Sequence, residues 1–500
     1  MLQAWLGPGF RAWLGLSGVT PGELEWLGFS SRERLCASGA GLLTQGQTRW
    51  SILPWSIMQD SFLLGALAQA LLAGEPRVEL LVYRCSRTLG KSWRWTGTLA
   101  ERYLRTFGTG TRPRHRDVVR FLRDDAGFQR ARSNYSDELL VSELLTAPQQ
   151  MQPPAAAGAW DIPAIDSLGD LAKWLGLDPG ELRWFADLKA LGYQKTGEQF
   201  RHYHYRILAK RFGSLRLIEA PKPRLKELQR QVLLWILEKI SPHPAVHGFV
   251  KGRSIKTFVA PQVGQRVVLR MDLRDFFPTF GGVRIQNLYR TVGYPEAVAD
   301  LLGGICTNVT PRDVWNGIGA DFGPAYVGEA RRLHVRPHLP QGAPTSPALA
   351  NISCYRLDCR LSALAESASA SYTRYADDLA FSGGEEFEKG VERFGLHVAA
   401  VLLEEGFRVN HRKTRVMRQG VRQHLAGLVT NQRPNIVRRD FDRLKAVLTN
   451  CVRMGPESQN REERQRFRSH LEGRVAFVEM ISTGKGRRLR AIFERIRWPE

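Results

Sequence analysis

Cysteine is scarce in this chain and follows no metal-binding pattern. The 500 residues contain six cysteines, none of them in a Cys-x-x-Cys pair or at zinc-finger spacing. Cys354 and Cys359 are five positions apart, which favours packing in a helix over metal binding. This usage argues against a disulfide framework and a zinc site, and it predicts a reduced, cytoplasmic protein.

Long apolar runs are also lacking. The longest candidate extends from Ser61 to Ala73, about thirteen residues, whereas a helix needs roughly 20 apolar residues to span a bilayer. The N-terminus lacks the basic and then apolar pattern of a secretory signal. We therefore expect a soluble protein with no membrane partner.

Acidic residues are the third shortage. The chain has 49 Asp and Glu against 72 Lys and Arg, which gives a net charge of +23 and a pI near 10.2. Such an excess is typical of proteins that bind a polyanion, because each neutralised phosphate releases a counterion. Since no long basic amphipathic helix stands out, nucleic acid is favoured over a membrane surface as the partner.

Against this shortage, two adjacent acids stand inside an apolar, β-prone segment, Tyr375-Ala-Asp-Asp378. Hydrophobic residues on both sides predict a strand, a tight turn at the acids and a returning strand. Aspartate is common in hairpin turns for purely conformational reasons, so the motif alone is weak. Its alternative role is to hold a divalent cation such as Mg²⁺.

A third acid gives that alternative weight. Val267 to Leu273 predicts a strand that carries Asp272 near its end. If the two elements are sheet neighbours, Asp272 meets Asp377 and Asp378, and such a cluster can hold two Mg²⁺ about 3.5–4 Å apart for an in-line phosphoryl displacement. The competing interpretation of Asp272 alone is a helix N-cap.

A loop between these elements reads Leu339-Pro-Gln-Gly-Ala-Pro-Thr-Ser-Pro and leads into the helix-prone Ala348 to Asn351. Its prolines and glycine predict an ordered turn followed by a helix. Gln341 and exposed backbone there can line a nucleotide pocket, although the composition is also that of an ordinary loop.

Taken together, these motifs resemble the bacterial reverse transcriptases, most closely the retron type. The resemblance covers about residues 165–450. Besides the two motifs above, four further blocks follow the family order: Leu215–Arg230, His247–Ile255, Glu405–Arg415 and Gln423–Asn431. The resemblance implies an α+β fold with the right-hand fingers, palm and thumb of a polymerase.

The domain organisation that we expect has five parts. A tryptophan-rich accessory domain of unknown role covers 1–133, and a Pro- and Ala-rich linker covers 134–164. The resemblance implies fingers over 165–265, a palm with fingers elements over 266–430 and a helical, basic thumb over 431–500. Within the accessory domain, Val78 to Tyr83 predicts a strand.

The resemblance also implies roles for individual residues. Asp272, Asp377 and Asp378 match the catalytic, metal-binding triad for two Mg²⁺. Phe277 matches the position that excludes a 2′-hydroxyl. The other matched positions are Arg216, Gln341 and Lys413 around the nucleotide and Arg253 near template or nucleotide. Beyond the matched region, the basic C-terminal end is expected to place Arg487 and Arg488 on the phosphates of the duplex.

These matched residues also have structural alternatives. Of the adjacent Phe276 and Phe277, we expect one to be a core residue. Isolated basic positions such as Arg216 and Lys413 are commonly solvated. Arg253 stands beside Ser254, where a helix could begin.

The implied activity is that of an RNA-directed DNA polymerase. The retron resemblance implies that the template is a cognate noncoding RNA and that the product is DNA made from deoxynucleoside triphosphates. It also implies a role in antiphage defence, in which an effector protein can be a further partner. The alternatives are a group II intron-like or other bacterial reverse transcriptase without branched-product priming, and a catalytically idle RNA-binding scaffold.

Two elements depart from the retron pattern. Phe258-Val-Ala-Pro-Gln262 stands where the family has Asn-Ala-x-x-His, and Leu425-Ala-Gly427 stands where it has Val-Thr-Gly. Because both elements are associated with the cognate RNA, these changes bear on the RNA partner and the primer and not on the chemistry.

Overall fold

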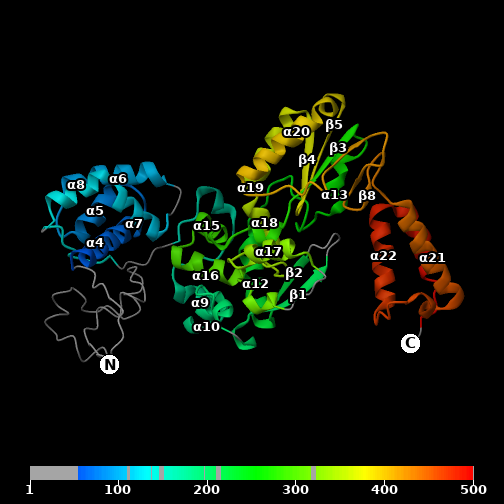
Figure 1. The fold of residues 1–500 in the computed structure, drawn as a ribbon, viewed down its shortest axis with the longest axis horizontal. Coiled ribbons are helices and arrows are strands. Elements are labelled where there is room, and N and C mark those ends of the chain that lie inside the picture. The colour runs from blue at the N-terminus through cyan, green and yellow to red at the C-terminus, as the bar shows by residue number, and fades with distance from the viewer. Residues whose placement is uncertain are drawn as a thin grey trace. The chain divides into compact units, whose positions relative to one another are not determined.

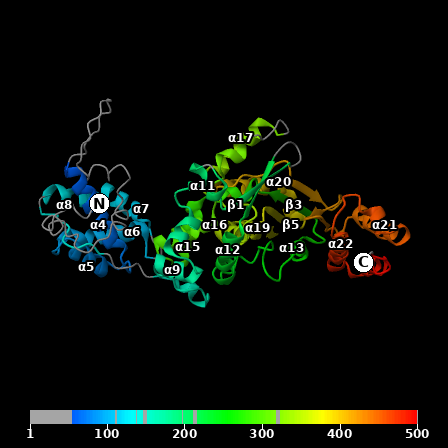
Figure 2. The same cartoon turned by 90° about the horizontal axis from the view of Figure 1, so that it is seen from below.

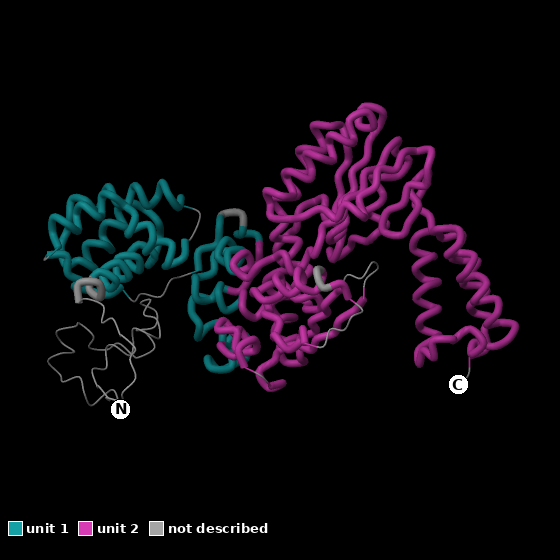
Figure 3. The backbone as a smooth tube through the Cα atoms, in the orientation of Figure 1, with its two compact units in different colours: residues 1–159, 164–182, 286–302 teal, residues 160–163, 183–285, 303–500 magenta. Residues whose placement is uncertain are grey.

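The computed structural model describes residues 55–109, 113–136, 138–145, 151–195, 197–209, 215–316 and 322–498. The chain forms two compact units (Figure 3), one of residues 1–159, 164–182 and 286–302 and one of residues 160–163, 183–285 and 303–500. Helices and sheets together confirm the α+β class. No helix in the described part of the chain is long and apolar enough to cross a membrane.

The first unit begins with a group of helices around one apolar core. The described α-helices that lie wholly in this unit are α4 Trp55–Leu72, α5 Val78–Thr88, α6 Arg94–Phe107, α7 His115–Asp124, α8 Ala126–Asn134 and α9 Leu168–Leu175. The core of α4 to α8 includes Trp93, as the tryptophan content of this region predicted. Trp5, Trp13, Trp26 and Trp50 lie outside the described residues.

The strand predicted at Val78 to Tyr83 is wrong, because these residues begin helix α5. Leu81, Cys85 and Thr88 are buried at the helical spacing of four and three residues. A short β-branched and apolar run is ambiguous by itself, and the packing of the longer segment makes it a helix.

The second unit contains three small antiparallel sheets. β1 Tyr203–Ala209 pairs with β2 Leu215–Pro221. The largest sheet has the order β4-β5-β3-β6, from β4 Ala370–Tyr375, β5 Asp378–Gly383, β3 Val267–Asp272 and β6 Arg415–Arg418. The third is β7 His424–Leu425, β8 Leu428–Val429 and β9 Asn435–Ile436.

Helices α19 Tyr355–Ser367 and α20 Glu385–Glu404 pack on the four-stranded sheet (Figures 1 and 2). The second unit also contains α11 Leu191–Gln194, α12 Pro223–Trp235, α13 Ile255–Val259, α14 Phe276–Thr279, α17 Pro324–His334 and α18 Ser346–Ser353. Helices α10 Pro179–Ala186, α15 Gly282–Val292 and α16 Glu296–Cys306 have residues in both units. The ordered turn into a helix that was predicted after Gln341 is confirmed by α18.

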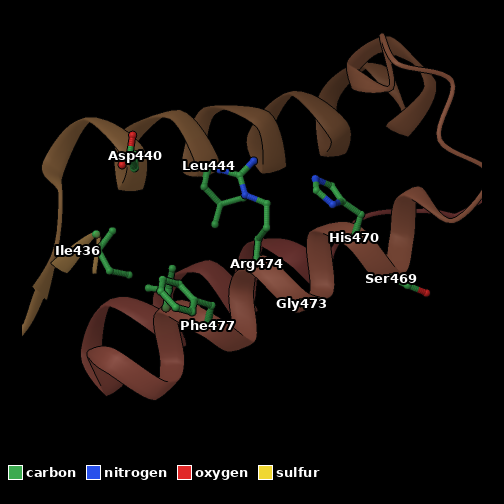
Figure 4. A pocket seen from close by; sticks show the side chains of 10 residues that line it. Ile436, Asp440, Leu444, Ser469, His470, Gly473, Arg474 and Phe477 are labelled. Carbon is green, nitrogen blue, oxygen red and sulfur yellow. The ribbon is translucent and has the colours of Figure 1, made fainter. Parts of the chain in front are cut away.

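The C-terminal part is helical and basic, as its sequence predicted. It consists of α21 Arg438–Met454, α22 Phe467–Ile481 and α23 Thr483–Phe493. A groove of about 650 Å³ runs between α21 and α22 (Figure 4), with His470, Arg474 and Phe477 of α22 among the residues that line it. Arg487 and Arg488 are exposed on α23.

Candidate active site

Three aspartates converge at one end of the four-stranded sheet. β4 and β5 form the predicted hairpin, and β5 pairs with β3 so that Asp378 lies directly opposite Asp272. Ala376 turns the hairpin with a φ of 54°, and the carbonyl of Asp377 accepts the N–H of Leu273 at 2.9 Å. The sheet pairing of the two acidic elements is therefore confirmed.

The aspartates differ in their surroundings. Asp272 is almost fully buried, and its carboxylate accepts hydrogen bonds at 2.8 Å from Asn410 Nδ2 and from Lys413 Nζ. Asp378 is held by Arg270, whose Nη2 lies 2.7 Å from Oδ1 and 3.0 Å from Oδ2. Two of the three carboxylates thus have a cationic partner.

Asp377 is the acid with an unfavourable charge environment. Burial, reinforced by the negative charges of Asp272 and Asp378, raises its pKa to about 6. Burial also raises the pKa of Asp378, although Arg270 opposes the shift. Carboxylates that repel one another in this way fit a divalent cation, since oxygen ligands of this kind are the ones that Mg²⁺ prefers.

Lys413 is the one basic residue of the expected set that contacts the triad. Phe277 is half-buried, whereas its neighbour Phe276 packs in the core against Phe280 and Phe407, so the expectation that one of the pair is a core residue is confirmed. The ring of Phe277 lies 6.5 Å from that of Phe249.

Gln341 lies on a different element from the triad. Its carbonyl accepts the N–H of Glu219 in β2 at 2.9 Å, and Gly342 packs against the backbone of that residue. Arg216 is exposed on the same strand. The loop of Gln341 is thereby fixed to the sheet that carries Arg216.

A buried hydrogen-bond network surrounds Glu219, the residue to which this loop is bonded. The Nε2 of His338 lies 2.8 Å from the Glu219 carboxylate, which also accepts hydrogen bonds from Asn308 and Thr310. Burial acts to raise the pKa of Glu219, but the charge and hydrogen bond of His338, together with His334 and Asn308, outweigh it, and the pKa is lowered. The His338 ring nitrogen and the Glu219 carboxylate are at hydrogen-bond distance, which is the geometry of an ion pair. His334 adds a third potential metal ligand, and the ligand atoms of the three residues lie within 4.8 Å of one another.

The remaining expected residues lie apart from the aspartates. Arg253 braces its own loop by donating to the carbonyls of Pro244 and Val246, and Ser254 caps α13. Arg487 and Arg488 belong to the C-terminal helices.

Arg270 and Asn410 are the site residues that the sequence motifs missed. Strand alternation is the signal for Arg270, since it stands two residues before Asp272 and therefore on the same face of β3. Asn410 lies three residues before Lys413, but no spacing rule would have connected it to Asp272.

Comparisons with known proteins agree with this geometry. The family model for reverse transcriptase (RNA-dependent DNA polymerase) matches residues 207–429. The retron Mx65 reverse transcriptase of Myxococcus xanthus is 38% identical over 67% of this chain and 73% of its own length. The chain belongs to the retron-type reverse transcriptases.

Two further relatives support this assignment. The retron Mx162 reverse transcriptase of Myxococcus xanthus is 39% identical over 65% of both chains. The retron Ec86 reverse transcriptase of Escherichia coli is 28% identical over 66% of this chain and 88% of its own length. This retron-type reverse transcriptase is an RNA-directed DNA polymerase, and enzymes of its class generally use divalent metal ions.

The two elements that depart from the retron pattern are half buried, since Phe258, Val259, Gln262 and Leu425 are buried and the other residues are partly or fully exposed. Phe258, Val259 and Leu425 belong to one core with the C-terminal helices, and the Gln262 side chain donates to Thr373 of β4. Ala426 and Gly427 form the turn between β7 and β8, both with positive φ. The buried substitutions therefore change packing beneath the catalytic hairpin rather than exposed contact groups.

Proposed function

We propose that Asp272, Asp377 and Asp378 hold two Mg²⁺ and that the chain copies RNA into DNA at this site. The observation that carries the proposal is the convergence of three carboxylates at the junction of β3 and β5, with the pKa of Asp377 raised to about 6. When bound, the ions supply charge neutralisation for the attacking and leaving oxygens. Lys413, 2.8 Å from Asp272, adds positive charge where pyrophosphate would leave.

The protein groups around the triad position the reactants. Asn410 and Arg270 orient the carboxylates of Asp272 and Asp378 through hydrogen bonds. We assign the loop of Gln341 and the strand of Arg216, which the hydrogen bond from Glu219 to Gln341 joins, to the incoming nucleotide and its triphosphate. Phosphoryl transfer depends on positioning and electrostatics more than on covalent chemistry, and this arrangement supports the proposed reaction on both grounds.

Phe277 is the proposed selector of deoxynucleotides. Its half-buried ring stands next to the core residue Phe276 and offers an edge that a 2′-hydroxyl would meet. Primer extension with labelled deoxynucleotides and ribonucleotides tests this role. We expect Phe277→Ala to raise the ribonucleotide-to-deoxynucleotide ratio by roughly 10-fold or more, since a steric gate discriminates by transition-state binding. An unchanged ratio would exclude Phe277 as the gate.

The finer proposals are a fingers, palm and thumb division with an N-terminal accessory domain, a cognate noncoding RNA, and a role in antiphage defence. The exposed Arg487 and Arg488 and the groove lined by His470 and Arg474 support duplex contacts by α22 and α23. Sequencing nucleic acid that copurifies with the protein tests the RNA. A branched RNA–DNA molecule supports retron priming, a linear complementary DNA points to another primer, and plaque counts with and without the gene test defence.

A further inference from the structure

Phe249 is an exposed aromatic residue beside the aspartate triad. Of the phenylalanines that the structure describes, it is the most exposed, with 56% of its surface accessible. Its ring centroid lies 6.5 Å from that of Phe277 and 6.2 Å from that of Tyr375, two residues before Asp377. Single exposed apolar side chains are common on protein surfaces, so what distinguishes this ring is its place next to Phe277 and Tyr375 and not its exposure alone.

The backbone of Phe249 is strained. Its φ is +59°, a conformation that a side chain with a Cβ disfavours. Among the described non-glycine residues with positive φ, it is the only aromatic one, and Asp275 and Ala376 share this conformation close by. Strained residues persist where the surrounding structure fixes them, and they cluster at functional sites.

The neighbours that fix Phe249 belong to the catalytic hairpin. A Cβ added to Gly248 would lie 2.7 Å from the backbone nitrogen of Ala376, so the chain passes directly against the hairpin turn. The carbonyl of Gly248 accepts from Asn351 at 2.9 Å, and the N–H of His247 donates to the carbonyl of Arg374 at 2.7 Å. The position of the ring is therefore tied to the position of Asp377 and Asp378.

We propose that Phe249 is a base-stacking residue whose exposed ring contacts a nucleobase bound beside the aspartates. An aromatic face accepts any of the bases, which suits an enzyme that must copy every template position. The inference rests on the proposed function, because it requires nucleotides to react at Asp272, Asp377 and Asp378. The base belongs either to the incoming deoxynucleotide or to the template–primer duplex.

Three substitutions at position 249 distinguish the effect of losing the aromatic ring from the effect of the strained backbone. Phe249→Tyr keeps the ring, Phe249→Leu keeps an apolar side chain without a ring, and Phe249→Asn removes the ring while favouring a positive φ. Leu396→Ala is the matched control, since Leu396 of α20 is even more exposed at 70% and has no place in the site. The purified full-length chain is used throughout.

Two constants are measured for each variant. Steady-state primer extension gives the KM for a deoxynucleoside triphosphate, and fluorescence anisotropy gives the Kd for a labelled RNA–DNA duplex without turnover. Phe249→Leu and Phe249→Asn should raise one of the two by roughly 5- to 150-fold, the range of a base–aromatic stack. Phe249→Tyr and Leu396→Ala should stay within about twofold, and Phe249→Asn should not lower the melting temperature.

The outcomes are separable. A raised KM with an unchanged Kd assigns the stacked base to the incoming nucleotide, and a raised Kd assigns it to the duplex. If Phe249→Leu and Phe249→Asn leave both constants within twofold, the proposal is overturned. Wild-type protein that incorporates no nucleotide contradicts the proposed function instead, and the duplex Kd then still decides whether the ring binds a base.

Discussion

The β4–β5 hairpin has two groups of charged side chains, a buried pair behind its turn and the acids at its tip. The charges are balanced in the buried pair and unbalanced at the tip. Beneath the hairpin, Arg374 and Asp358 are both fully buried and joined by two hydrogen bonds of 2.7 Å. At its tip, the acids are only partly enclosed, and the pKa of Asp377 is raised to about 6. The lower pair is matched in charge and geometry, whereas the upper group has an excess of negative charge.

Within this hairpin, one set of charged residues stabilises the turn and another is proposed to carry the chemistry. Arg374 also donates to the carbonyl of Ala376 at 3.2 Å and to Asn351 at 3.1 Å, so a single side chain fixes the turn from below. The acids at the tip are held in place by that support at a cost in electrostatic energy. A cation bound there, as proposed, would relieve that cost.

The largest effect on activity is expected at the tip. Asp377→Asn removes one proposed metal ligand and should lower deoxynucleotide incorporation by a factor on the order of 10³ or more. Because the substitution also relieves repulsion, the melting temperature should stay equal or rise. Asp161→Asn, the same change at an acid whose side chain is 96% exposed and which is not part of the site, is the control in a primer-extension assay. Full activity in Asp377→Asn would remove this residue from the metal site.

The largest effect on stability is expected beneath the hairpin. Arg374→Met leaves Asp358 buried without its partner and should lower the free energy of unfolding by about 3–5 kcal/mol. Urea denaturation followed by circular dichroism measures this change. Adding Asp358→Leu should recover part of the loss, since the uncompensated charge is then removed. A single variant as stable as wild type would show that the pair does not support the turn.

A smaller effect should appear in the pH dependence of the tip. Since the pKa of Asp377 is raised to about 6 in the metal-free protein, protons occupy this carboxylate below that pH and compete with Mg²⁺. The Mg²⁺ concentration for half-maximal activity should therefore rise by up to about tenfold per pH unit below pH 6 and be nearly constant above pH 7. Metal titrations between pH 5 and 8 check this, and a flat requirement across that range would contradict it.

The smallest expected effect concerns Arg270, the cation paired with Asp378 at the tip. Its side chain is about one-fifth exposed and binds the Asp378 carboxylate. Arg270→Gln should lower the Mg²⁺ requirement at pH 8 by roughly two- to tenfold, because the metal no longer competes with the guanidinium, and should lower kcat through looser positioning. Arg270→Lys should lie between wild type and Arg270→Gln. An unchanged Mg²⁺ requirement would show that Arg270 does not compete with the metal for Asp378.

The strands that carry the acidic residues were easier to predict from the sequence than the helices of the first unit. The two acidic motifs carried their own strand patterns, so the pairing of Asp272 with Asp378 needed only a shared sheet. The helix at Val78–Thr88 was missed because its first residues favour a strand and the packing of Leu81 and Cys85 decides otherwise.

The side chains beneath and around the triad were harder to find. Asp358 lies in α19 and meets Arg374 only in three dimensions, and no spacing along the chain connects them. The same holds for Glu219 and His338, which are 119 residues apart and joined by a buried hydrogen bond. Charge pairs of this kind depend on the tertiary fold, whereas a metal-binding motif is largely local in sequence.

The tight passage of Gly248 over Ala376 limits which sequences this site can adopt. With a Cβ only 2.7 Å from a backbone nitrogen, no other residue fits position 248 unless the hairpin turn shifts as well. A shift of the turn would move Asp377, so a side chain at position 248 would disturb the aspartates next to it. Because the contacted atom is a backbone nitrogen, no change of the Ala376 side chain can make room for it. A mutational library at position 248 should therefore recover few active variants other than glycine.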